Sequence, residues 1–236
     1  MILTWYGLAC IKLETQGKVI ALNPFKKDSA KGLDKAPRFK TDIALISSSL
    51  PEYMNPEMVE AAEFAIDSPG EYEIGGVFIQ GISNQKNSLS TQANPSARLV
   101  SDESERAPLG AASEEANTIF ILKTEELSVA HLGAFNDAKL SEEAAEILEG
   151  VDVLILPVGG GQVLSGAKAS SLITQIGPSL VIPVFYNIPG LKMKLDEVDK
   201  FINEVKLKPI REEKLNLKKK DLDEEETKLV LLSPQI

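Results

Sequence analysis

Short apolar segments separated by turn residues recur along the chain and predict a fold rich in β-strands. Near the N-terminus, apolar runs at 2–6, 9–13 and 18–22 predict a meander of short strands. The continuous apolar run at 43–46 is typical of a strand buried on both faces. Further strands are predicted at 71–74, 77–82, 118–122, 127–132, 153–157, 180–184, 214–217 and 228–232.

Helical signals alternate with these strands. Asn55 can cap a helix whose first position is Pro56, with the acid Glu57 near its positive end, so a helix is predicted from there to about residue 62 or 63. Other helices are predicted at 141–148, 167–176 and 195–205. Strands first and strand–helix alternation later indicate an α/β fold with helices packed outside sheets.

One stretch breaks this pattern. Residues 84–116 are rich in Ser, Asn, Gln, Ala and acids and hold few large apolar side chains. Such a segment buries too little surface to offset the entropy of ordering it, so a long disordered loop is predicted there. The rest has the length and apolar content of a single domain spanning 1–236.

The charge and composition of the chain limit the kinds of partner that it can bind. Asp and Glu number 35 against 25 Lys and Arg, giving a net charge of -10, which repels nucleic acid. The lone cysteine excludes an internal disulfide. No apolar run approaches the roughly 20 residues that span a bilayer, and no basic, signal-like segment opens the sequence. A cytoplasmic protein without membrane or nucleic-acid partners is expected.

Five segments, in this order, resemble the metal-dependent hydrolase branch of the metallo-beta-lactamase superfamily. They read WYGLAC, ALNPF, PGEYEIGGVFIQGI, AHLGAFND, and VDVLILPVGGG with VIPVFYNIPG. The resemblance implies a four-layer αββα sandwich, made of two mixed sheets with helices on the outer faces. It also implies a zinc-dependent hydrolase, since zinc lowers the pKa of a bound water.

The positions that hold metal in that family carry other residues here. The resemblance places Leu8 at the histidine of the WYGHA-type segment, and Ala134 at the bridging aspartate. Phe185 stands at the final histidine, and a histidine expected near 83–87 is absent. The HxHxDH loop corresponds to Ser48, Leu50, Glu52 and Tyr53. Of these, only Glu52 offers a carboxylate, and one carboxylate does not hold Zn²⁺. No metal cofactor is therefore expected.

These losses favour a non-catalytic member of the family, acting as a binding or assembly module. Its partner would be an unidentified protein or small molecule. Both a homo-oligomer and a hetero-oligomer are compatible with the sequence. The alternative is a hydrolase of phosphodiester, lactone or related ester bonds with a non-standard metal site at Glu52, its weak catalytic candidate. The sequence therefore favours a non-enzyme, with a metal-dependent hydrolase as the alternative.

Two further motifs invite functional hypotheses. His131, the only histidine, ends an apolar strand and is interpreted as a structural histidine. The run Ser47–Ser49 lacks a GxSxG elbow and is interpreted as polar filling of the vacated site.

Overall fold

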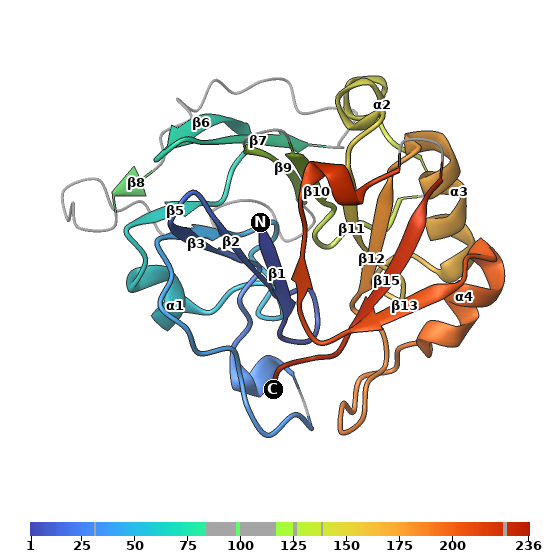
Figure 1. Cartoon of the computed structure of the whole chain (residues 1–236). Helices are drawn as coiled ribbons and strands as arrows, with labels where there is room; N and C mark the ends of the chain where they lie inside the picture. Colours follow the sequence, from blue (N-terminus) through green and yellow to red (C-terminus); the bar gives the residue numbers. More distant parts are fainter. Residues whose placement is uncertain (31, 84–97, 100–116, 125–126, 138, 224–225) are drawn as a thin grey trace.

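Two β-sheets lie face to face with helices on their outer sides (Figure 1). The computed structural model describes residues 1–30, 32–83, 98–99, 117–124, 127–137, 139–223 and 226–236. Within these ranges no helix is long and apolar enough to cross a membrane. The four-layer αββα sandwich predicted from the sequence is confirmed.

The first sheet is built from the N-terminal meander. Among the described residues its strand order is β14 (Leu215–Asn216), β1 (Ile2–Trp5), β2 (Ile11–Thr15), β3 (Lys18–Leu22), β4 (Ile43–Leu45), β5 (Phe64–Ile66) and β8 (Arg98–Leu99). β1, β2 and β3 pair antiparallel, whereas β3, β4 and β5 pair parallel. The sheet is therefore mixed, as expected.

The second sheet is mixed as well. Its described strands run in the order β13 (Pro209–Glu212), β15 (Lys228–Leu232), β12 (Leu180–Val184), β11 (Val153–Pro157), β10 (Leu127–His131), β9 (Thr118–Thr124), β7 (Val77–Ser83) and β6 (Gly70–Ile74). Central strands β11 and β12 are buried along their whole length, as a sheet covered on both faces requires.

Helices cover the two outer faces. α1 (Pro56–Glu60) lies outside the first sheet, and α2 (Glu142–Leu148), α3 (Gly166–Ile176) and α4 (Val198–Val205) lie outside the second (Figure 1). Serine and asparagine side chains cap three of these helices by accepting backbone N–H bonds. Short 3-10 helices η1 (Lys27–Ser29) and η3 (Lys219–Asp221) occur in loops.

Several boundaries differ from the predictions. The strand predicted at 9–13 lies at Ile11–Thr15, because Tyr6 N–H donates to the Cys10 carbonyl and closes a turn before it. The helix predicted at 195–205 begins at Val198, since Asp196 N–H donates to the Gly159 carbonyl instead.

Three strands were not predicted: β5, β8 and β13 are each only two to four residues long, too short for a periodic pattern to register. β8 lies inside the predicted loop at 84–116, where it pairs antiparallel with β5. Apart from Arg98 and Leu99, that loop lies outside the described residues.

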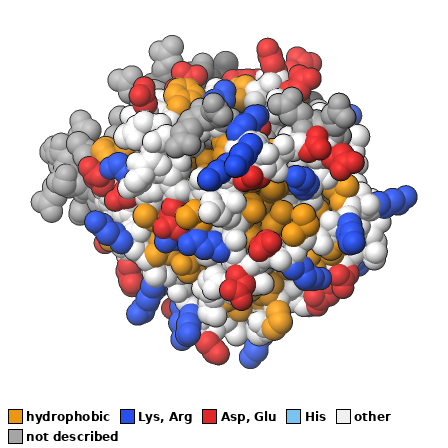
Figure 2. All heavy atoms as spheres, in the orientation of Figure 1, with side chains coloured by type: hydrophobic (Ala, Val, Ile, Leu, Met, Phe, Trp, Pro, Cys, Tyr) orange, Lys and Arg blue, Asp and Glu red, His pale blue; other side chains and the backbone are white. Residues whose placement is uncertain are grey.

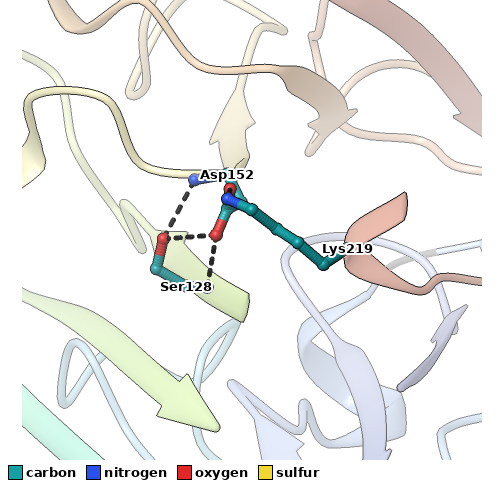
Figure 3. Close-up of polar contacts among 3 residues, drawn as sticks. All are labelled: Ser128, Asp152 and Lys219. Atoms are coloured by element: carbon teal, nitrogen blue, oxygen red, sulfur yellow. Dashed lines mark hydrogen bonds and ion pairs between the residues drawn. The ribbon is translucent and has the colours of Figure 1, made fainter. Parts of the chain in front are cut away.

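A partly buried polar cluster fastens the C-terminal segment to the second sheet (Figure 3). The Asp152 carboxylate, 8% exposed, accepts hydrogen bonds from the Ser128 backbone N–H at 2.8 Å and from its hydroxyl at 2.9 Å. Lys219 Nζ lies 2.7 Å from the other carboxylate oxygen. Because β10, the start of β11 and η3 meet here, this carboxylate joins segments far apart in sequence.

Replacing that carboxylate by an amide is expected to destabilise the fold. Asp152→Asn keeps the shape but removes the charge facing Lys219, and should lower the free energy of unfolding by about 1–3 kcal/mol. The exposed pair Lys18–Glu63, whose Glu63 side chain is 54% exposed, supplies the control. Glu63→Gln should change the same quantity by less than about 0.5 kcal/mol. Equal effects of the two substitutions in urea titrations would contradict this account.

Candidate functional site

The positions where the resemblance places the family's metal ligands (Leu8, Ser48, Leu50, Glu52, Tyr53, Ala134 and Phe185) are called the predicted metal positions below. Two of them, Leu8 and Phe185, are hydrogen-bonded to each other through the backbone. Phe185 N–H donates to the Leu8 carbonyl at 2.9 Å, and Trp5 Nε1 donates to the same oxygen at 2.9 Å. Leu8 and Phe185 both adopt left-handed backbone, with φ of 44° and 52°, which non-glycine residues rarely do. Such conformations persist only where the surroundings hold them, and these shared hydrogen bonds do so here.

An aromatic stack joins a third predicted position to these two. The rings of Tyr53 and Phe185 lie nearly parallel, with centroids 5.3 Å apart and an interplanar angle of 2°. Both side chains are fully buried, as is Leu8. The Tyr53 hydroxyl has no hydrogen-bond partner in the described part of the chain. Burial raises the pKa of Tyr53 well above its usual range, so the phenol stays neutral.

Backbone hydrogen bonds connect Tyr53 to two other predicted metal positions, Leu50 and Ser48. Tyr53 N–H donates to the Leu50 carbonyl at 2.9 Å, and Leu50 N–H donates to Ser48 Oγ at 3.3 Å. Residues 48–53 therefore form one compact turn beside the aromatic pair. The half-buried Glu52 carboxylate makes no ion pair with any described residue.

Asn117 and Gly133 hold the loop that contains Ala134 beside Ser47. The Ala134 N–H donates to Asn117 Oδ1 at 2.7 Å, while Asn117 Nδ2 donates to the Leu132 carbonyl. The preceding residue, Gly133, has φ of 63°, and a Cβ there would lie 2.2 Å from Ser47 Oγ. Only glycine fits so close an approach, which brings the AHLGAFND and SSSLPEY loops together.

The single histidine is a structural residue between the sheets. His131 Nδ1 accepts a hydrogen bond from Gly133 N–H at 3.0 Å, which leaves the proton on Nε2, 2.9 Å from the Ala9 carbonyl. Asn23 Nδ2 lies 3.4 Å from Nδ1, and Asn23 Oδ1 accepts from Ser47 N–H at 2.8 Å. The ring is fully buried, and desolvation lowers the pKa of His131 to about 4. It is therefore neutral at pH 7.

Sequence reasoning missed the polar residues that position this region. Trp5, Asn23 and Asn117 each bind backbone groups of the loops described above. Asn23 offered a detectable signal, because it ends a strand in the ALNPF segment and asparagine tolerates the left-handed backbone, φ 49°, that it adopts. Asn117 directly follows the predicted loop at 84–116, and no local sequence pattern indicated its role.

The side chains at the predicted metal positions do not fit a zinc ion. Zinc takes imidazole, thiolate or carboxylate ligands, whereas Leu8, Leu50, Ala134 and Phe185 offer only carbon. Throughout the described ranges, no three His, Cys, Asp or Glu side chains gather closely enough to hold a metal ion. Two of the predicted metal positions instead form the stacked ring pair of Tyr53 and Phe185.

Comparison with known proteins identifies the family. Residues 2–185 match the model of the beta-lactamase superfamily domain, so the chain belongs to that superfamily. A relative from Caldivirga maquilingensis, named a UPF0173 metal-dependent hydrolase, is 23% identical over 201 residues, covering 83% of this chain and 86% of the relative. A protein of Lysinibacillus sphaericus with the same name is 22% identical over 204 residues, covering 79% and 86%.

Solved structures support the same fold. A Thermotoga maritima protein, provisionally described as a Zn-dependent hydrolase of the metallo-beta-lactamase superfamily, superposes with a TM-score of 0.70. It is 23% identical and the match covers 98% of this chain and 99% of that one. A metallo hydrolase from Ignicoccus hospitalis gives a TM-score of 0.57 at 17% identity, covering 87% and 90%. At these identities the likeness concerns the fold alone.

Removing the unpartnered hydroxyl of the stack is expected to stabilise the protein. Tyr53→Phe keeps both rings and removes a buried polar group without a partner, so the free energy of unfolding should rise by about 1 kcal/mol. Tyr72 is the control, because its hydroxyl donates to the Ser68 carbonyl at 3.1 Å. Tyr72→Phe should lower the same quantity by about 1 kcal/mol. A loss of stability in Tyr53→Phe would show that the hydroxyl is bound.

The buried histidine should make the fold sensitive to acid. The pKa of His131 is about 4 in the folded chain against 6.5 ordinarily, so the unfolded chain binds the proton first as pH falls. The contribution of the neutral His131 to the free energy of unfolding is fully present above pH 6.5. It is lost as the pH falls toward 4, which lowers the free energy of unfolding by up to roughly 3 kcal/mol.

A chain with one histidine gives one imidazole Hε1 resonance, so its NMR titration reads this pKa directly. The expected midpoint lies near pH 4. A midpoint near 6.5 would contradict the buried, neutral ring. His131→Gln, where it folds, should show a weaker acid dependence of its urea midpoint than the unaltered chain.

Proposed function

We propose that this chain is a non-catalytic member of the superfamily that retains the fold as a binding or assembly module. The observation that carries the proposal is the buried stack of Tyr53 on Phe185, beside Leu8, at three of the positions where the resemblance expects metal ligands. These side chains offer no oxygen, nitrogen or sulfur ligand apart from a neutral phenol. Without a Lewis acid, the water of the family's hydrolysis has no source of activation.

The packing around these positions also favours a structural rather than a catalytic use. Catalytic sites keep an open position for water or substrate, whereas Leu8, Tyr53 and Phe185 are each at most 1% exposed. The neighbouring polar groups, Asn23, Asn117 and His131, bind backbone groups instead of facing an opening. A scaffold held by such contacts is stable without metal and suits a partner-binding role.

A metal-dependent hydrolase is the second candidate. The similar proteins named metal-dependent hydrolases favour it, together with the Glu52 carboxylate, which pairs with no described cation. In this alternative Glu52 would hold a non-standard metal that acts on phosphodiester, lactone or related ester bonds. It requires further ligands beside Glu52, because one carboxylate does not hold the metal.

Metal content and turnover separate the two candidates. After equilibration with zinc or manganese and removal of excess ion, the purified chain is expected to retain far less than one metal per molecule. It should turn over no substrate in an ester and phosphodiester panel. Glu52→Gln should change neither result. Stoichiometric metal with chelator-sensitive turnover that Glu52→Gln abolishes would establish the hydrolase and overturn the proposal.

A further inference from the structure

A surface cavity of about 480 Å³ lies apart from the predicted metal positions, none of which lines it. Residues of the loop that follows β3, of the turn after β1 and of the end of the described chain line it. Figure 1 shows that loop beside the C-terminus. Its volume falls in the range of small-molecule sites. Its lining includes Tyr6, Lys27, Asp34, Lys35, Arg38 and Ile236.

The cavity concentrates positive charge on an acidic protein. Lys27, Lys35 and Arg38 line it against one acid, Asp34, and none of the four makes an ion pair within the described residues. Segment 26–40 carries six Lys and Arg against two Asp, although the whole chain has a net charge of -10. Cations left without acidic partners around one hollow form an anion-attracting site.

An aromatic wall stands beside these cations. The Tyr6 ring lies 4.8 Å from the Phe39 ring, and Lys12 Nζ lies 5.7 Å from the centroid of Phe39. Tyr6 therefore lines the cavity while its ring packs against Phe39. Burial raises the pKa of its hydroxyl, which stays neutral.

The cationic loop is anchored rather than free. Ala30 and Leu33 are buried in the core, and a Cβ on Gly32 would lie 2.1 Å from the Gly190 carbonyl oxygen. A Cβ on Gly7 would lie 3.3 Å from Ile236 Cδ1. The same Cβ would lie 3.8 Å from Leu33 Cδ1, so the loop and the last residues both pack against the turn at Gly7.

We propose that this cavity binds a small phosphate monoester attached to a planar ring. A phosphate monoester carries close to two negative charges at pH 7, matching three cations offset by one acid. The guanidinium of Arg38 suits phosphate oxygens because it donates two parallel hydrogen bonds, and the lysines add point charge. Tyr6 supplies a ring on which a planar group can stack.

A nucleic-acid strand does not suit the same site. Figure 2 shows acidic and basic side chains intermixed over one face, with no continuous basic track of the kind that follows a phosphate backbone. The inference rests on the proposed binding role, and it names a ligand class for that role. It does not depend on the residues at the predicted metal positions.

Calorimetric titration of the full chain with adenosine 5′-monophosphate tests the inference, with adenosine and inorganic phosphate as partial probes. Saturable binding of the monophosphate is expected, at least about tenfold tighter than either partial probe. Lys35→Gln combined with Arg38→Gln should weaken it by about tenfold or more. Lys208→Gln, at an exposed lysine distant in sequence, is the matched control and should leave the affinity unchanged.

Absence of binding, or equal binding by the double variant, would overturn the inference. Adenosine binding as tightly as the monophosphate would also overturn it, because the phosphate would then contribute nothing. These outcomes are separate from the metal test. A metal-loaded, active chain that still binds the monophosphate through Lys35 and Arg38 refutes only the non-catalytic proposal.

Discussion

The interaction on which this fold most depends is the hydrogen-bonding of one buried imidazole. His131, at the end of β10 in the second sheet, binds the Ala9 carbonyl in the turn between β1 and β2, and Asn23 just after β3 of the first sheet. Asn23 in turn orients the backbone of Ser47, whose carbonyl accepts from Thr118 of the second sheet. Both sheets are thus tied at the edge where the loops meet. A buried polar ring with every nitrogen satisfied fixes a single register for the two layers.

The neighbouring loops hold a defined backbone geometry around side chains that carry no metal ligand. Leu8 and Phe185 keep left-handed backbone and a mutual hydrogen bond, although neither side chain can ligate a metal. Their conformation is held by Trp5 and by the stack with Tyr53. Membership of the beta-lactamase superfamily therefore describes the architecture of this chain. The activities named for its relatives reach it only as a hypothesis, to be set against the side chains present.

The sequence predicted the architecture well because the long apolar strands and capped helices carry strong local patterns. Asn55-Pro56-Glu57 and the buried run at 153–157 are examples, and both elements are confirmed, although α1 ends at Glu60 rather than at 62 or 63. The short strands β5 and β8 depend on pairing partners distant in sequence, so no local pattern predicts them. For the candidate site, the resemblance named the positions, but the stacking of Tyr53 on Phe185 arises from tertiary packing. The cationic cavity combines the loop before residue 40 with the last residues, and no sequence window contains both.

Anomalous diffraction from crystals grown with excess zinc would show whether these loops can hold a metal. We expect an intact Tyr53–Phe185 stack and no zinc peak within coordination distance of Leu8, Ser48, Leu50, Glu52, Tyr53, Ala134 or Phe185. A zinc peak bound by Glu52, above all with the stack opened, would contradict this expectation and return this chain to the metal-dependent hydrolases.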